Sequence, residues 1–193
     1  VHEAGLNPDG SDASSNTESA SGSFTVSATD GIASVVIGGQ TFTLAEMQAF
    51  DGTQTVNTGA GILTLTDYSG TSLNGVVSYT YVLSGAINNS TAPGATGTGL
   101  DDSVTVTVNG AGGTTASDDV VVRIVDDVPT AKADVAVTLA EDGTNNTASG
   151  NVLTNDLSGA DAPAEFVSWS ATANATAMTE LAKYGALTLG TDG

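Results

Sequence analysis

Short runs in which an apolar residue alternates with Thr, Ser or another small residue recur along this chain and restrict it to a β-rich fold. Alternation with a period of two is typical of a strand that buries only one face. Glycine clusters separate several of these runs, as tight hairpin turns require. In the first two thirds of the sequence the runs cover residues 23–29, 35–37, 40–44, 62–66, 76–83, 102–108 and 120–125. About seven such strands predict an antiparallel immunoglobulin-like β-sandwich, with one helical turn over 45–50 and a core that includes Phe24, Phe42, Tyr79 and Tyr81.

A proline ends the last of these runs. Pro129 follows Asp126-Asp127-Val128, and proline cannot continue a sheet ladder. Beyond it, the pattern favours a strand over Ala133–Leu139. Later segments favour a strand over 165–171, a helix over 175–184 and a short strand over 186–189. We therefore predict a sandwich over 1–127, a hinge over 128–134 and, over 135–193, the N-terminal half of a second, similar domain that an inserted domain could split.

A weak internal repeat relates the two parts. Val137–Gly143 parallels Val1–Gly5 and matches Glu141 with Glu3, and the last strand of the chain parallels one midway through the first sandwich. In the first copy further strands follow that point, whereas in the second none do. The prediction is tandem sandwiches of which the second is incomplete, with its sequence resuming after Gly193 directly or after an inserted ligand-binding domain.

Charge excludes several function classes. The 193 residues carry a formal charge of −19, from 22 acidic side chains against Arg123, Lys132 and Lys183. Three cations cannot form the basic surface that nucleic acid requires.

The rest of the composition narrows the class of protein further. The 39% apolar content is too high for a disordered polyanion. Cysteine is absent, so disulfides and thiolate metal sites are excluded. No apolar run approaches the ~18 residues of a membrane span, so we expect no membrane insertion. The composition favours an extracellular location and a monomer.

The acidic residues around Pro129 point to a metal. Asp126, Asp127 and Asp134 flank the hinge, and carboxylates this dense repel one another unless a cation lies between them. Ca²⁺ prefers all-oxygen sites with six to eight ligands. These residues therefore predict a calcium-binding hinge. The alternative to a calcium site is that these acids are ordinary solvated loop residues.

Further acids join the candidate set through the expected pairing. If the last hairpin centres on Gly112-Gly113, Asp101 and Asp102 lie opposite Val125 to Asp127. Loops of the second domain add further carboxylates, and Glu3, with Asp9 and Asp12, would form the equivalent site at an upstream junction. The candidate calcium ligands are Asp101, Asp102, Asp126, Asp127, Asp134, Glu141, Asp156, Asp161 and Glu3.

At this point the chain resembles a family. Asp126–Asp134, after the strand 121–125, looks like the joints of giant RTX adhesins, the type I-secreted surface proteins of Gram-negative bacteria. Ala148–Asp156 and Gly159–Asp161 are similar to their VCBS or cadherin-like repeats. The resemblance implies a bacterial immunoglobulin-like extender module on the cell surface, part of adhesion and biofilm formation. It also implies that Ca²⁺ at the junctions stiffens the rod and that neighbouring domains of the same adhesin are its partners.

Catalysis has little support in the sequence. His2 is the only histidine, no cysteine nucleophile exists, and no glycine loop could cradle phosphate. We therefore expect no enzyme. The rival function is a carbohydrate- or surface-binding module, in which Trp169 stacks on a sugar or Thr-rich strands form a flat face. The ordinary explanation of both features is a core anchor and an exposed strand face.

Overall fold

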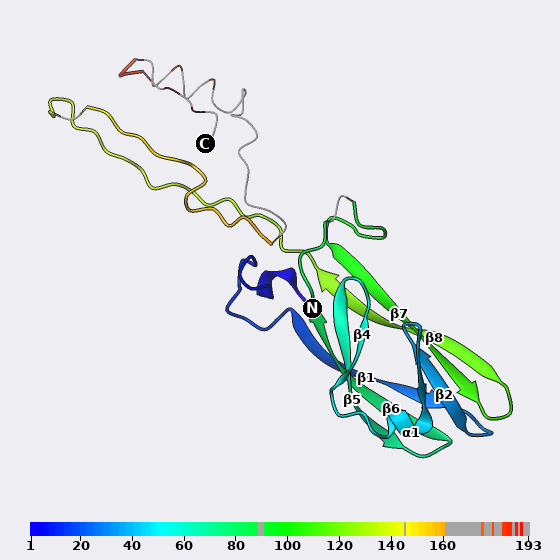
Figure 1. Ribbon diagram of the computed structural model, residues 1–193. Coiled ribbons are helices and arrows are strands. Elements are labelled where there is room, and N and C mark those ends of the chain that lie inside the picture. The colour runs from blue at the N-terminus through cyan, green and yellow to red at the C-terminus, as the bar shows by residue number, and fades with distance from the viewer. Residues whose placement is uncertain are drawn as a thin grey trace.

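The computed structural model describes residues 1–88, 91–144, 146–160, 175, 179, 183–186, 188 and 190. Within this part, two four-stranded antiparallel sheets lie face to face in the first 125 residues (Figure 1). One sheet has the strand order β1-β6-β5-β4 and the other β3-β2-β7-β8. The predicted all-β sandwich is confirmed.

The elements follow one another closely along the chain. In order they are η1 (Glu3–Gly5), β1 (Ser19–Ser27), β2 (Ile32–Ile37), β3 (Gln40–Thr43), α1 (Leu44–Met47), β4 (Gln54–Asn57), β5 (Gly61–Gly70), β6 (Asn74–Leu83), β7 (Gly99–Gly110) and β8 (Thr115–Val125). The sheet made of β8, β7, β2 and β3, packed against β1, β6 and β5, matches the immunoglobulin-like arrangement of strands.

Local sequence explains the turns between these strands. The β2–β3 hairpin turns through Gly38 and Gly39, whose φ values of +54° and +85° suit residues without a side chain. After β3, the Thr43 hydroxyl accepts a hydrogen bond from the Glu46 N–H, and the Glu46 carboxylate accepts one from the Thr43 N–H at 2.7 Å. This capping box starts α1 at the predicted helical turn, and its backbone hydrogen bond lowers the pKa of Glu46.

The core lies between the sheets and matches the inward face of the alternating runs. Phe42 and Tyr81 are buried as predicted. Phe24 and Tyr79 are only partly buried, with ring centroids 6.2 Å apart, because they lie on β1 and the neighbouring β6 near one side of the sandwich. The most deeply buried apolar side chains include Val35, Ile37, Met47, Leu63, Leu65, Val77 and Ile124.

Beyond Val125 the character of the chain changes. Residues 128–160, where described, form two extended arms that run away from the β8 end of the sandwich (Figure 1). They are joined by the isolated bridge between Thr130 and Leu157, with N–H to O distances of 2.9 and 3.0 Å. The strand expected over Ala133–Leu139 is not formed, because this extended segment has no ladder partner among the described residues.

The remaining expectations for the second part lie largely outside the described residues. That holds for the whole of the strand over 165–171 and for most of the helix over 175–184 and the short strand over 186–189. Ala175 and Thr179 are helical, and the Thr179 hydroxyl donates to the Ala175 carbonyl at 2.9 Å.

Candidate functional site

The candidate site lies at the end of the sandwich where β8 stops and the chain continues toward the hinge. Here the first residues run beside β8 in parallel. The Val1 ammonium donates to the Arg123 carbonyl at 2.8 Å, and the Val125 N–H donates to the Val1 carbonyl at 2.9 Å. We call this end of the molecule, with η1 and the residues following β8, the hinge pole.

Glu3 is the most deeply buried acid at the hinge pole. Its side chain is only 1% exposed. One carboxylate oxygen accepts a hydrogen bond from the Ile87 N–H at 2.6 Å, and the other accepts one from the Asp127 N–H at 3.4 Å. Glu3 therefore ties the start of the chain to the residues after β8. The expectation of a separate upstream site around Glu3 is wrong, because the pairing of Val1 with β8 brings Glu3 to the same pole as Asp127.

Asp127 and Asp126 lie side by side in the chain but differ in their surroundings. Asp127 is 9% exposed and accepts hydrogen bonds from the Ser11 N–H at 2.7 Å and the Ser11 hydroxyl at 2.6 Å. One oxygen of Asp126, Oδ1, is buried and has no hydrogen-bond partner among the described residues. A buried acceptor without a partner costs about 1–3 kcal/mol, more if it is charged, and a cation bound at this oxygen would offset that cost.

A second carboxylate oxygen in the same condition belongs to Glu18, which sequence analysis did not select. Glu18 Oε2 is buried without a partner in the described part of the chain. It lies against η1, because a Cβ added to Gly5 would be 2.6 Å from it. Glu18 and Ser11 carry no motif in the sequence, and only the folding of residues 1–18 onto β8 reveals them.

Asp101 and Asp102 are not at the hinge pole, which corrects the register expected for the last hairpin. The ladder centres on Gly112, so Asp101 pairs with Arg123 and Asp102 with Val122 instead of with residues 125–127. Asp101 is exposed and forms an ion pair with Arg123 at 3.0 Å. Both aspartates thus lie further down β7 than a shared site with Asp126 would need.

Asp102 has a structural role inside the sandwich. It is 8% exposed, and its Oδ2 accepts hydrogen bonds from the Tyr81 hydroxyl at 2.6 Å and the Thr58 hydroxyl at 2.5 Å. Burial, together with the hydrogen bond to Asp102, raises the pKa of Tyr81. Tyr81 therefore remains a neutral donor to the carboxylate, and this network joins β6, β7 and the turn between β4 and β5.

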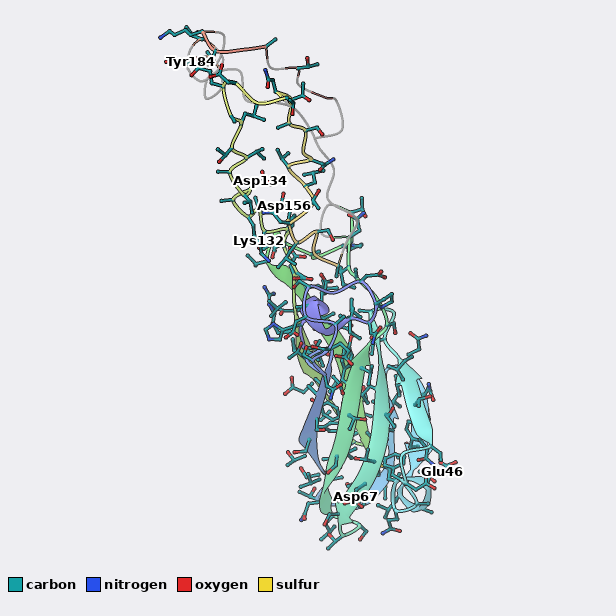
Figure 2. All side chains as sticks on the ribbon, turned by 90° about the vertical axis from the view of Figure 1, so that its left-hand side faces the viewer. Glu46, Asp67, Lys132, Asp134, Asp156 and Tyr184 are labelled. Carbon is teal, nitrogen blue, oxygen red and sulfur yellow. The ribbon has the colours of Figure 1, made fainter. Side chains whose placement is uncertain are left out.

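The acids of the extension are spread along its length. Asp134 is exposed, whereas Asp156 accepts a hydrogen bond from the Lys132 N–H at 2.7 Å. Figure 2 shows Lys132, Asp134 and Asp156 near one another in the part of the extension next to the sandwich. Glu141 lies in an exposed turn of the segment around residue 140, at the far end of the arms (Figure 1). The structure therefore does not bring Glu141 to the hinge, and Asp161 lies outside the described residues.

The potential ligand atoms at the hinge pole are of the type that a hard divalent cation prefers. Glu3, Glu18, Asp126 and Asp127 offer only oxygen ligands, and two of their oxygens are buried without partners. Among the described residues, no group of three or more Asp, Glu or His side chains is already arranged around a common metal position. Trp169, on which the sugar-binding alternative rests, is not among the described residues.

Comparison of the chain with protein-family models, curated proteins and solved structures found no match. Within the part of the chain that the structure describes, no helix is long and apolar enough to cross a membrane.

Proposed function

We propose that this chain is an extender segment of a bacterial cell-surface adhesin, stiffened by Ca²⁺ at the hinge pole. In this proposal it is an extracellular spacer between neighbouring domains and not an enzyme. The observation that carries the proposal is the buried, unpartnered Oδ1 of Asp126, positioned where the sandwich joins the extension.

Three features support a cation at this position. Glu3 and Asp127 are buried acids within one hydrogen-bond step of each other. Glu18 adds a second buried oxygen without a partner beside η1. The chain has 22 acidic and three basic residues, so protein cations can neutralise few of its carboxylates.

Hydrogen bonds among the residues of the pole support this role. Glu3 accepts from the Asp127 N–H, and Asp127 accepts from Ser11, so the hinge starts from a segment fixed on two sides. Asp134 and Asp156 follow on the extension, near Lys132 (Figure 2). When bound, Ca²⁺ would supply charge neutralisation and a common ligand for acids of both parts. The segment after Val125 would then lose the freedom to bend.

The test is a calcium titration of the whole chain, from chelator to millimolar, followed by thermal unfolding and small-angle scattering. A site saturated about a hundredfold above its Kd stabilises the folded state by about 2.7 kcal/mol. For a chain of this size that corresponds to a rise in Tm of roughly 5–10 °C. Scattering should report a longer and less variable particle in calcium.

Matched variants locate the effect. Asp126→Asn should remove most of the calcium-dependent rise in Tm while leaving the Tm in chelator unchanged or higher, because an unpartnered buried charge is lost. Asp127→Asn should also weaken the response. Asp67→Asn changes an exposed acid at the opposite end of the sandwich (Figure 2) and should behave like the unchanged chain. Equal Tm and scattering in calcium and chelator would reject the proposal.

A further inference from the structure

Aspartate or asparagine followed by glycine recurs in this chain, and such dipeptides can rearrange without an enzyme. The glycine nitrogen attacks the side-chain carbonyl carbon of the preceding residue, and glycine favours this step because no side chain hinders the backbone. The reacting atoms must come within about 3–3.5 Å of each other in an aligned geometry. Among the described residues the dipeptides are Asp9-Gly10, Asp30-Gly31, Asp51-Gly52, Asn74-Gly75, Asn109-Gly110 and Asp142-Gly143.

Both asparagine dipeptides are held in the sheets of the sandwich. Gly75 is buried on β6, which pairs with β1 on one side and β5 on the other. Gly110 is also buried, and its N–H donates to the Thr114 carbonyl at 2.8 Å. The Asn109 amide donates to the Ser34 hydroxyl at 3.0 Å. Neither dipeptide can reach the reactive geometry without breaking such contacts, so the fold protects the two sites whose neutral amides are intrinsically the more reactive.

The three aspartate dipeptides of the sandwich are fixed by other contacts. The Asp30 carboxylate accepts a hydrogen bond from the Gly112 N–H in the turn between β7 and β8. The Asp51 carboxylate accepts hydrogen bonds from the Thr53 hydroxyl and N–H at 2.6 and 3.1 Å. These bonds lower the pKa of Asp51 and disfavour the protonated acid from which water leaves. Gly10 lies against η1, where an added Cβ would be 2.3 Å from a backbone carbonyl oxygen.

Asp142-Gly143 differs from these sites, because it lies in an exposed turn at the far end of the arms (Figure 1). The Asp142 side chain is exposed, and its carboxylate accepts no hydrogen bond from the part of the chain that the structure describes. The Gly143 N–H donates to the Ala140 carbonyl at 3.1 Å, within the same turn. The bridge between Thr130 and Leu157 lies at the other end of the arms. A single local hydrogen bond at an exposed tip opens readily, so this dipeptide can reach the reactive geometry.

The first copy of the internal repeat contains the same turn with a different residue. The match of Glu141 with Glu3 aligns Ala140–Gly143 with His2–Gly5. In each turn the glycine N–H donates to the carbonyl three residues earlier, at 3.1 and 3.3 Å. The residue before the glycine is Asp142 in the second copy and Ala4 in the first. The turn therefore forms without a carboxylate at this position, and only the second copy carries a reactive dipeptide there.

We propose that Asp142-Gly143 is the site at which the folded chain rearranges spontaneously to isoaspartate. The Gly143 nitrogen attacks Cγ of the protonated Asp142 carboxyl, an N–Cγ bond forms, and the amide proton leaves with the carboxyl hydroxyl as water. Water then opens the cyclic succinimide. Breaking the new N–Cγ bond restores aspartate, whereas breaking the original peptide bond leaves the chain running through the side chain. The isoaspartate product has one more methylene group in its backbone, so the turn changes shape.

The test is ageing of the full chain for several weeks at neutral pH in chelator, so that calcium has no part in it. Peptide mapping then separates aspartyl from isoaspartyl peptides. We expect isoaspartate at position 142 to exceed that at each described dipeptide of the sandwich by about tenfold or more, the factor that about 1.4 kcal/mol of barrier gives. Asp142→Ala reproduces the turn of the first copy and should remove the product without changing the Tm. Gly143→Ala keeps the carboxyl and should slow the reaction, because its side chain hinders the attack.

Asp142→Asn sharpens the test, because it places in the extension the same Asn-Gly dipeptide that β6 and β7 contain. In the folded variant position 142 should lose ammonia and form isoaspartate, while Asn74 and Asn109 stay intact. In denaturant, which removes the sheets, the three positions should react at similar rates. Equal reaction of the three in the folded variant overturns the proposal. Isoaspartate that accumulates first within the sandwich, or an aged chain without it at position 142, overturns the proposal as well.

Discussion

The sandwich and the extension carry similar alternating sequences, but the apolar side chains are buried in the sandwich and exposed in the extension. In β8, Val122 and Ile124 are 8% and 0% exposed, because β7 pairs with the strand and the other sheet covers its inward face. In the extension, Val135 and Val137 are 89% and 67% exposed although the same period of two is present. An alternating sequence favours a strand, but the strand forms only where a partner strand pairs with it and another layer covers its apolar face.

The acids show the same contrast. Asp102 is enclosed and accepts two hydrogen bonds, one from the Tyr81 hydroxyl on the opposite sheet and one from the Thr58 hydroxyl in the turn between β4 and β5. Asp134 is exposed, and Asp156 accepts its one described hydrogen bond from a backbone N–H next to the hinge. In the sandwich a carboxylate organises the core, whereas on the extension Asp134 is exposed to solvent and Asp156 is half-buried.

The largest expected effect comes from truncating one apolar side chain in each region. Leu63→Ala removes a side chain that is 0% exposed and should lower the free energy of unfolding by about 2–5 kcal/mol. Val137→Ala, in the extension, should change it by less than about 0.5 kcal/mol. Denaturant unfolding of both variants measures the difference. Equal losses would mean that the extension contributes a packed core of its own.

A smaller effect should follow from removing the Tyr81 hydroxyl. Tyr81→Phe leaves Asp102 with one hydroxyl donor fewer, at a cost of about 1–3 kcal/mol. Because folding raises the pKa of Tyr81, the neutral form is favoured in the folded state. This stabilisation is complete below the unfolded pKa near 10 and is lost as the pH rises toward the folded value.

Unfolding measured between pH 8 and 12 tests whether the stabilisation by Tyr81 is lost as the pH rises. The unchanged chain should lose stability above pH 10 more steeply than Tyr81→Phe. Tyr184→Phe alters a tyrosine that is 88% exposed and is the matched control. A Tyr81→Phe variant with the same alkaline slope as the unchanged chain would show that the Tyr81–Asp102 contact does not set it.

The smallest effect is expected at the surface of the sandwich. Asp101→Asn breaks the ion pair with Arg123, whose partners are 59% and 46% exposed. Exposed pairs of this kind contribute about 0–1 kcal/mol and less in high salt. Thermal unfolding in low and high salt should show a small difference that salt removes. A loss above 1 kcal/mol would place Asp101 among the structural acids beside Asp102.

Sequence reasoning located most of the sandwich because its strands are regular. The runs at β2–β3, β5–β6 and β7–β8 have clear alternation and glycine turns, and the helical turn has Leu44, Met47 and Phe50 at helical spacing. β4 escaped prediction since Val56 is the only apolar residue in its four positions. Its pairing with β5 is a tertiary effect that no local pattern expresses.

The candidate site was harder to predict because it depends on contacts between distant residues. A turn centred on Gly112-Gly113 pairs Asp101 with Ile124 and Asp102 with Arg123, within one residue of the observed ladder, so their expected place opposite residues 125–127 was a miscount and not a limit of the sequence. Glu3 was recognised through the repeat, yet its contact with Asp127 spans 124 positions. Glu18 requires knowledge of how the first residues fold onto β8.

The parallel pairing of Val1 with β8 has a mechanical consequence. The two hydrogen bonds, from Val1 to Arg123 and from Val125 to Val1, lie across the direction of the strands. A force that pulls Val1 back along β8 while pulling Asp127 forward loads both bonds at once in shear, and neither can open before the other. Under such a load this end of the sandwich would open abruptly, at a threshold force, and not by gradual peeling.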